Sequence, residues 1–261
     1  MKTRILAGLL LAPLLIVVWL GGWPLLIATF LVGALGLREF FKAFEKLGIK
    51  ASLPIGWSAL IVLYGILIPE GTLIHFQLWF FGVILCSLLM LFQIEKRTLE
   101  DAMATITGIF YIVFFSAHVV MIDGIPGYEP MTWLVLITAF GTDTMAYFTG
   151  VFLGKHKLCP KISPKKTVEG ALGGLAGSMI FTSLFFWVYD PSLVFHGVTL
   201  GLLGGIISQF GDLTASIFKR KMGVKDYGTL IPGHGGILDR FDSVLFTAPL
   251  VYYYVIMVLL H

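Results

Sequence analysis

Residues 102–122 read AMATITGIFYIVFFSAHVVMI and contain no Asp, Glu, Lys or Arg. One α-helix needs about 20 apolar residues to cross a lipid bilayer, so this stretch is long enough to span a membrane. Similar runs recur along the 261-residue chain, in which 57% of residues are hydrophobic and 13% are charged. A typical soluble domain has about 25% charged residues. The composition therefore predicts an integral membrane protein.

The apolar runs end at charged residues or at Pro and Gly, and they predict an all-α polytopic membrane protein with about nine transmembrane helices. We expect these helices near residues 5–21, 24–37, 53–69, 73–93, 102–122, 131–153, 169–189, 192–215 and 239–260. The first run also fits the start of a signal peptide, but no small-residue cleavage site follows it, which favours an uncleaved helix. The charged segment 38–50 is expected to be helical, either along the membrane surface or as a solvated extension of the second span.

The basic residues predict the orientation of the chain. If the segments between the spans alternate between two sides, all 18 Lys and Arg residues fall on one side. The charged residues on the other side are all acidic, namely Glu70, Asp123, Glu129 and Asp190. Cytoplasmic segments are enriched in Lys and Arg, so we expect a cytoplasmic N-terminus and an external C-terminus. We further expect residues 1–130 to supply N-terminal helices and residues 131–261 to supply the functional region of one integrated membrane domain.

Acidic residues gather in the last four predicted spans, and charged groups inside a membrane usually mark functional sites. They are Asp143, Glu169, Asp212, Asp239 and Asp242. Ion pairing at the surface, or the helix dipole, is an alternative reason for Glu169, Asp239 and Asp242. It explains Asp143 and Asp212 poorly, because these two lie deeper and have no basic neighbour in the sequence.

Two predicted cytoplasmic loops have the composition of phosphate-binding segments. The loop of residues 155–170 is rich in lysine and ends where a span begins, and either Ser163 or Thr167 can cap that helix. Exposed N–H groups at a helix N-terminus next to Lys165 and Lys166 would attract anions.

The second loop, residues 219–242, combines basic residues with a glycine cluster around His234. Glycines such as Gly235 and Gly236 allow backbone N–H groups to approach an anion closely. With the neighbouring carboxylates, this composition predicts phosphates bridged by a divalent metal ion. His234 is either a turn residue or a ligand contact.

Residues 216–242, SIFKRKMGVKDYGTLIPGHGGILDRFD, resemble the signature of the phosphatidate cytidylyltransferases, also called CDP-diacylglycerol synthases. Residues 163–170 (SPKKTVEG) and 143–150 (DTMAYFTG) resemble the same family, whereas the first spans are similar to it only in hydropathy. The resemblance implies transfer of CMP from CTP to phosphatidic acid, giving CDP-diacylglycerol and pyrophosphate in phospholipid biosynthesis. It implies an enzyme of the inner (cytoplasmic) membrane whose active site faces the cytoplasm.

The resemblance also implies Mg²⁺, with Asp212 and Asp239 as the metal ligands. Asp143 is expected either to hold a second cation, monovalent or divalent, or to belong to a polar network. We expect Asp143, Lys166, Asp212 and Asp239 to take part in catalysis. The expected substrate-binding residues come from both loops: Ser163, Lys165, Lys166, Thr167, Glu169, Lys219, Arg220, Lys225, Asp226, His234, Gly235, Gly236, Arg240 and Asp242. A phosphate monoester has a second pKa of about 6, so no general base is expected and His234 is assigned to binding.

The expected partners are CTP, phosphatidic acid and the lipid bilayer, with no nucleic acid. Small residues at Gly201, Gly204 and Gly205 would allow close helix packing, either within the chain or in a homodimer. A transporter is an alternative, but it would have acids in both halves of the chain. A CDP-alcohol phosphotransferase would carry a helix motif that is absent here, and an enzyme acting on an archaeal isoprenoid lipid phosphate would share the loops but is usually shorter.

Overall fold

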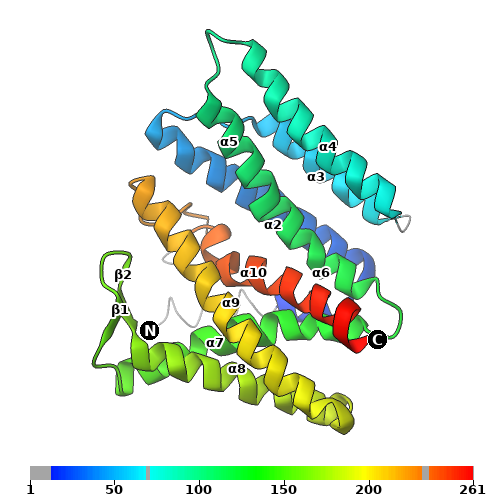
Figure 1. Ribbon diagram of the computed structural model, residues 1–261, viewed down its shortest axis with the longest axis vertical. Coiled ribbons are helices and arrows are strands. Elements are labelled where there is room, and N and C mark those ends of the chain that lie inside the picture. The colour runs from blue at the N-terminus through cyan, green and yellow to red at the C-terminus, as the bar shows by residue number, and fades with distance from the viewer. Residues whose placement is uncertain (1–12, 69–70, 231–234, 261) are drawn as a thin grey trace. The chain divides into compact units, whose positions relative to one another are not determined.

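The computed structural model describes residues 13–68, 71–230 and 235–260, and helices make up most of them (Figure 1). The chain divides into two compact units. Unit 1 comprises Met1–Met121 and Lys221–Arg240, and unit 2 comprises Ile122–Arg220 and Phe241–His261. The segment that follows α9 is therefore grouped with the N-terminal helices rather than with its neighbours in the sequence.

Unit 1 is built from the N-terminal helices. Residues 13–20 are helical. They are followed by α2 (Gly22–Phe44) with the short helix η1 (Glu45–Leu47), α3 (Leu53–Leu67), α4 (Leu73–Leu89) with η2 (Met90–Phe92), α5 (Leu99–Gly108), the π-helical η3 (Ile109–Phe114) and the start of α6 (Phe115–Asp123). The expected helix in the charged segment 38–50 is confirmed as far as Leu47, because α2 and η1 are continuous.

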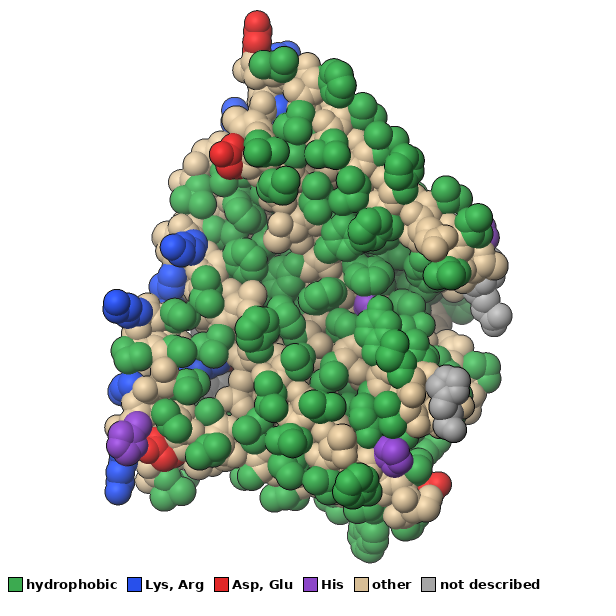
Figure 2. All heavy atoms as spheres, viewed as in Figure 1, with side chains coloured by type: hydrophobic (Ala, Val, Ile, Leu, Met, Phe, Trp, Pro, Cys, Tyr) green, Lys and Arg blue, Asp and Glu red, His purple; other side chains and the backbone are tan. Residues whose placement is uncertain are grey.

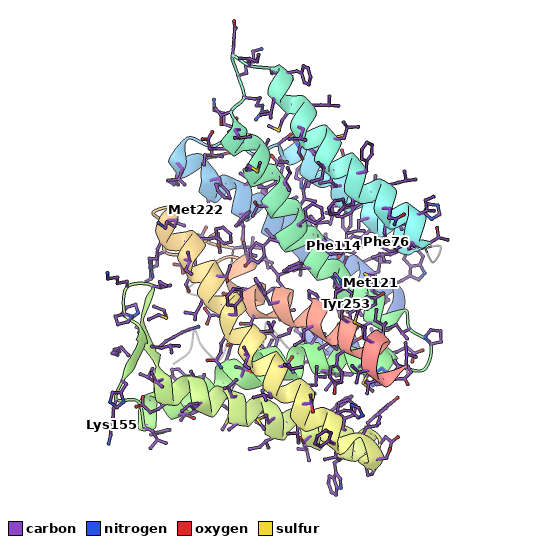
Figure 3. All side chains as sticks on the ribbon, viewed as in Figure 1. Phe76, Phe114, Met121, Lys155, Met222 and Tyr253 are labelled. Atoms are coloured by element: carbon purple, nitrogen blue, oxygen red, sulfur yellow. The ribbon has the colours of Figure 1, made fainter. Side chains whose placement is uncertain are left out.

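A buried acid joins two segments of unit 1. Asp101 is only 2% exposed, and its carboxylate accepts hydrogen bonds from the backbone N–H groups of Lys50 (2.6 Å) and Thr98 (3.0 Å). Thr98 in turn caps α5 by accepting from the Asp101 N–H. Further along, the ring of Phe114 (labelled in Figure 3) stacks on Trp79 of α4, with centroids 5.8 Å apart. A polar cap thus holds the beginning of α5, and aromatic rings pack its continuation, η3, against α4.

Unit 2 contains the remaining helices and one small sheet. It includes η4 (Glu129–Met131), α7 (Thr132–Phe152), strands β1 (Lys157–Cys159) and β2 (Ser163–Thr167), α8 (Val168–Tyr189), η5 (Pro191–Leu193), α9 (Val194–Lys221), most of α10 (Leu238–Tyr254) and the π-helical η6 (Val255–Leu259). The sequence predicted a loop where β1 and β2 pair as an antiparallel hairpin. The alternation of polar residues there is too short to reveal a strand before the pairing partner is known.

Glycines allow the helices of unit 2 to approach one another. A Cβ at Gly177 of α8 would overlap the Met145 side chain of α7, and one at Gly204 of α9 would lie 2.7 Å from Thr138. Gly201 likewise faces the backbone of Met179 on α8. The expected close packing at the glycines of α9 is thus confirmed within the chain.

The protein is a polytopic membrane protein of the all-α class. Among the described residues, seven helices are long and apolar enough to cross a membrane: Gly22–Leu47, Leu73–Phe92, Leu99–Asp123, Glu129–Phe152, Val168–Tyr189, Pro191–Lys221 and Leu238–Leu259. Helix α3 is apolar but shorter. Many large hydrophobic side chains are exposed, including Phe92 (84%) and Val188 (76%), as a surface in contact with lipid requires. A total of nine spans and the orientation of the termini stay predictions.

Candidate active site

Three of the acids singled out in the sequence come together in unit 2, each from a different helix. Asp143 lies on α7, Asp212 on α9 and Asp242 on α10. The Asp242 carboxylate interacts electrostatically with those of Asp212 and Asp143 and with the Lys219 ammonium group. Asp242 is 8% exposed. Helix packing therefore gathers three carboxyl groups around a buried position, with Lys219 as a neighbouring basic residue.

Ser243 is a polar member of this cluster that the sequence did not indicate. Its hydroxyl donates to Oδ2 of Asp143 at 3.2 Å, and its backbone N–H donates to Oδ1 of Asp242 at 2.8 Å. Ser243 is 2% exposed. One small residue thus orients two carboxylates on different helices. A serine directly after an acid inside an apolar span was the available signal.

The lysine-rich hairpin places the ammonium group of Lys166 beside Asp212. Nζ of Lys166 on β2 lies 2.5 Å from Oδ2 of Asp212 on α9, and about a quarter of each side chain is exposed. Asp212 also accepts a long hydrogen bond from Ser216 (3.5 Å). These residues are far apart in the sequence, so only the fold reveals that Asp212 has a basic partner. The expected catalytic residues Lys166 and Asp212 therefore meet.

Further contacts hold the hairpin against α8 and α9. Thr167, rather than Ser163, caps α8 by accepting from the Gly170 N–H at 3.1 Å. Glu169 accepts from the backbone N–H groups of Lys155 (3.0 Å) and His156 (3.2 Å), and from Nδ1 of His156 (2.6 Å). Nε of Arg220 donates to the Ile162 carbonyl at 3.3 Å. In this structure Glu169 and Arg220 hold the loop in place.

Basic side chains gather around the hairpin, whereas hydrophobic side chains cover the helices beside it (Figure 2). Lys155, labelled in Figure 3, lies where α7 gives way to this hairpin. Lys165 is exposed. The hairpin therefore presents several ammonium groups in addition to Lys166. Such a surface attracts phosphate anions.

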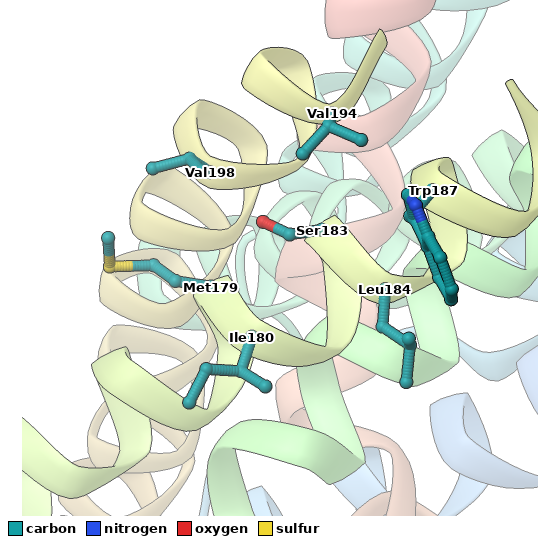
Figure 4. A pocket seen from close by; sticks show the side chains of 7 residues that line it. All are labelled: Met179, Ile180, Ser183, Leu184, Trp187, Val194 and Val198. Atoms are coloured by element: carbon teal, nitrogen blue, oxygen red, sulfur yellow. The ribbon is translucent and has the colours of Figure 1, made fainter. Parts of the chain in front are cut away.

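A separate hollow in unit 2 has a different character. Its volume is about 490 Å³, and the side chains that line it are mostly apolar: Met179, Ile180, Ser183, Leu184, Trp187, Val194 and Val198 (Figure 4). None of these seven residues is charged. This hollow cannot neutralise a triphosphate, so the nucleotide site is not expected there.

In unit 1, Asp239 organises the glycine-rich loop between α9 and α10, of which residues 222–230 and 235–237 are described. Its Oδ2 accepts from the backbone N–H groups of Tyr227 (2.8 Å) and Gly236 (2.9 Å). Gly235 has a φ of +86°, and a Cβ there would lie 2.6 Å from the same oxygen. Only glycine combines this backbone conformation with such a close approach. Asp239 therefore folds the loop back toward the start of α10.

Three other expected substrate-binding residues of this segment differ in their exposure. Lys225 and Asp226 are exposed, and Arg240 is half-buried. His234 and Gly233 lie outside the described residues, so the assignment of His234 to binding stays a prediction.

Glu39 of α2 is the residue of unit 1 that sequence reasoning missed. Its carboxylate accepts from the backbone N–H groups of Ile237 (3.1 Å) and Leu238 (2.9 Å), at the start of α10. In the sequence, Glu39 is one acid in a mixed-charge segment, nearly 200 positions away. Nothing in that local pattern indicates its partner.

The comparison with known proteins decides the family. A sequence model of the cytidylyltransferase family matches residues 2–258. The chain belongs to the cytidylyltransferase family. The match includes the N-terminal helices, for which the sequence had offered only similar hydropathy, as well as both loops.

Relatives of this cytidylyltransferase support the same grouping. A phosphatidate cytidylyltransferase of Synechocystis sp. is 41% identical over 92% of this chain and 91% of its own length. One of Bacillus subtilis is 35% identical over 97% of each chain. One of Staphylococcus aureus is 51% identical over 113 residues, which is 42% of this chain and 43% of its own.

A divalent cation fits the donor chemistry of the acids in this cytidylyltransferase. The described residues contain no group of three or more His, Cys, Asp or Glu side chains close enough to enclose a metal ion. Mg²⁺ needs less, because it is commonly held by one or two carboxylates together with water and substrate phosphates. Asp212, already neighbouring a cation at Lys166, provides an oxygen donor of the required kind.

Proposed function

We propose that this cytidylyltransferase transfers CMP from CTP to phosphatidic acid, giving CDP-diacylglycerol and pyrophosphate in phospholipid biosynthesis. The observation that carries the proposal is the 2.5 Å pair between Lys166 and Asp212, which joins a lysine-rich hairpin to the acidic cluster. The names of the relatives supply the acceptor lipid.

The reaction joins two anions. An oxygen of the phosphatidate phosphate attacks the α-phosphorus of CTP, and the bond between that phosphorus and the oxygen bridging to the β-phosphorus breaks. Pyrophosphate leaves with the electron pair. A phosphate monoester with a second pKa of about 6 is already largely ionised at neutral pH. Catalysis therefore depends on positioning and on neutralising charge rather than on a general base.

The side chains of the hairpin and the acidic cluster divide these tasks. Lys166 would neutralise a phosphate oxygen, and its ion pair with Asp212 holds the ammonium group in one direction. Lys219, which interacts with Asp242, would supply a second positive charge. Ser243 keeps the Asp143 carboxylate oriented. The exposed Lys165 would help to bring the nucleotide in from solution.

Mg²⁺ is the proposed cofactor, with Asp212 and Asp239 as proposed ligands. When bound, the ion would neutralise negative charge on the phosphates during transfer. Asp239 already accepts two backbone hydrogen bonds through Oδ2. Those bonds would fix the direction of its carboxylate whether or not an ion is present. A second cation, monovalent or divalent, near Asp143 is also proposed.

The direct test uses purified protein in lipid nanodiscs with CTP, phosphatidate and Mg²⁺. We expect CDP-diacylglycerol, identified by its mass, and one pyrophosphate for each molecule formed. Omission of phosphatidate should stop CTP consumption. If no CDP-lipid and no pyrophosphate are formed, the proposal is wrong.

We also propose that the site faces the cytoplasm from the inner membrane, where CTP is available while the lipid tails stay in the bilayer. This orientation predicts that the loop near Asp190 is external. Hydrogen bonds from Ser192 hold the pKa of Asp190 below its ordinary value, as expected for an exposed, ionised acid. In a Cys86→Ser, Cys159→Ser background, Ser192→Cys should react with a membrane-impermeant thiol reagent added outside intact cells. Labelling only after lysis would reverse the orientation. A homodimer stays a prediction.

A further inference from the structure

Two residues near the end of α2, Glu39 and Phe40, contact the glycine-rich loop of unit 1 at Ile237 and at Tyr227. Glu39 accepts from the N–H groups of Ile237 and Leu238 at the end of the loop. The next residue, Phe40, is fully buried and its ring lies 6.0 Å from that of Tyr227, near the beginning of the loop. The N-terminal region therefore contacts the loop through a buried aromatic ring and a carboxylate.

The carboxylate of Glu39 fits the loop closely. A Cβ at Gly228 would collide with Oε1 of Glu39, and one at Gly236 would collide with Oε2. The Cα of Gly236 in turn lies 3.2 Å from the position of a Cβ at Gly228. Glycines on both sides of the loop thus make room for one carboxylate.

The same carboxylate satisfies the start of a helix. The first N–H groups of a helix have no partner within the helix, and Glu39 binds that of Leu238, the first residue of α10, and that of Ile237 before it. A negative charge at this end also interacts favourably with the helix dipole. Asp239 binds two other N–H groups of the loop, at Tyr227 and Gly236. Glu39 and Asp239 together fix four backbone groups.

We propose that Glu39 is a positioning residue for cytidylyl transfer: by holding the N–H groups of Ile237 and Leu238, it sets the conformation of residues 235–237 of the glycine-rich loop for binding the CTP phosphates. The first spans then contribute to nucleotide binding in addition to anchoring the protein. The assignment of CTP to this loop rests on the proposed function, in which Asp239 is a metal ligand, and on the expected binding by Gly235 and Gly236, whereas the anchoring by Glu39 does not.

The test compares Glu39→Ala and Glu39→Gln with the control Glu45→Ala. Gln keeps the shape of the side chain and one acceptor oxygen, whereas Ala removes both acceptors. Glu45 lies on the same helical segment but is exposed. Hydrogen–deuterium exchange of the peptide covering residues 235–240 reports the anchoring without any reaction. We expect exchange about tenfold faster in Glu39→Ala, an intermediate rate in Glu39→Gln, and the wild-type rate in Glu45→Ala.

Kinetics on the same proteins distinguish positioning from a general loss of folded enzyme. A smaller folded fraction lowers the apparent kcat but leaves KM unchanged. We expect the KM for CTP to rise about tenfold in Glu39→Ala and less in Glu39→Gln, with the KM for phosphatidate within about twofold of wild type. If Glu39→Ala does not fold, Glu39→Gln alone decides the result.

Wild-type exchange at residues 235–240 in both Glu39 variants would overturn the proposal. So would faster exchange with an unchanged KM for CTP, because the loop would then be anchored without affecting nucleotide binding. If the wild-type protein itself transfers no cytidylyl group, the proposed function fails, and the exchange measurement still reports whether Glu39 anchors the loop.

Discussion

Two carboxylates of unit 1 and two of unit 2 differ in what they bind. In unit 1, Glu39 and Asp239 each accept hydrogen bonds from two backbone N–H groups. In unit 2, Asp143 and Asp212 bind side chains, Ser243 and Lys166 respectively. Backbone partners cannot leave without unfolding the loop, whereas a lysine can move from a carboxylate to a phosphate. Similar acids in one sequence can thus hold backbone groups in one place and exchangeable side chains in another.

Neutralising the proposed metal ligands should have the largest effect. Asp212→Asn and Asp239→Asn keep an acceptor oxygen but lose the charge, and each should lower kcat at least about 1000-fold, which corresponds to about 4 kcal/mol. Both variants should still insert in the membrane. Asp190→Asn, which changes an exposed acid outside the cluster, should retain the wild-type rate. Wild-type activity in either variant would remove that residue from the proposed metal site.

Replacing Lys166 of the hairpin should have the next largest effect. Lys166→Met breaks a partly exposed pair, and such pairs contribute at most about 1 kcal/mol to stability, so the Tm should change little. We expect kcat/KM for CTP to fall about thirtyfold, or about 2 kcal/mol, because the ammonium group is also proposed to neutralise a phosphate oxygen of CTP. Lys161→Met, at an exposed hairpin position, is the matched control. Equal losses in both variants would mean that only the net charge of the hairpin matters.

A smaller effect is expected from a glycine of the loop in unit 1. Gly228→Ala introduces a Cβ that would collide with the Glu39 carboxylate, and we expect the KM for CTP to rise about fivefold, or about 1 kcal/mol. Gly65→Ala on α3 is the control, because a Cβ there meets nothing within 4 Å. A Gly228→Ala enzyme with unchanged KM would show that the loop tolerates displacement of Glu39.

An effect of similar size is expected at Ser243. Ser243→Ala removes one 3.2 Å hydrogen bond to Asp143, worth about 1 kcal/mol, so kcat should fall about fivefold. Thr247→Val removes a hydroxyl from the same helix that donates to the Val135 carbonyl, and it should keep the wild-type kcat. If the two variants behave alike, Ser243 has no role in orienting Asp143.

Much of the fold was predictable because a membrane imposes a simple rule on the sequence. The expected helices of residues 73–93, 102–122, 131–153, 169–189, 192–215 and 239–260 each overlap a helix long enough to span. The helical extension beyond residue 38 was also expected and is present up to Leu47. The β1–β2 hairpin was not expected, because strand pairing between Lys157 and Thr167 depends on a turn that the lysine-rich composition does not indicate.

The candidate site was predictable in its members but not in their pairings. Charge inside apolar spans indicated Asp143 and Asp212, and the lysine-rich loop at a helix N-terminus indicated Lys166. Their partners come from distant segments: Lys166 for Asp212 and Ser243 for Asp143. Glu39 escaped prediction for the same reason, since hydrogen bonds to the backbone of Ile237 and Leu238 leave no residue type to recognise.

Cytidylyl transfer at the acidic cluster is tested by following the phosphorus atoms of CTP in wild-type and Asp212→Asn protein side by side. With CTP labelled at the α-phosphorus, the wild-type protein should transfer the label into lipid, and with CTP labelled at the γ-phosphorus the label should appear only in pyrophosphate. The Asp212→Asn protein should leave both labels in CTP. Label from the γ-phosphorus in the lipid, or undiminished transfer by Asp212→Asn, would contradict cytidylyl transfer at this acidic cluster.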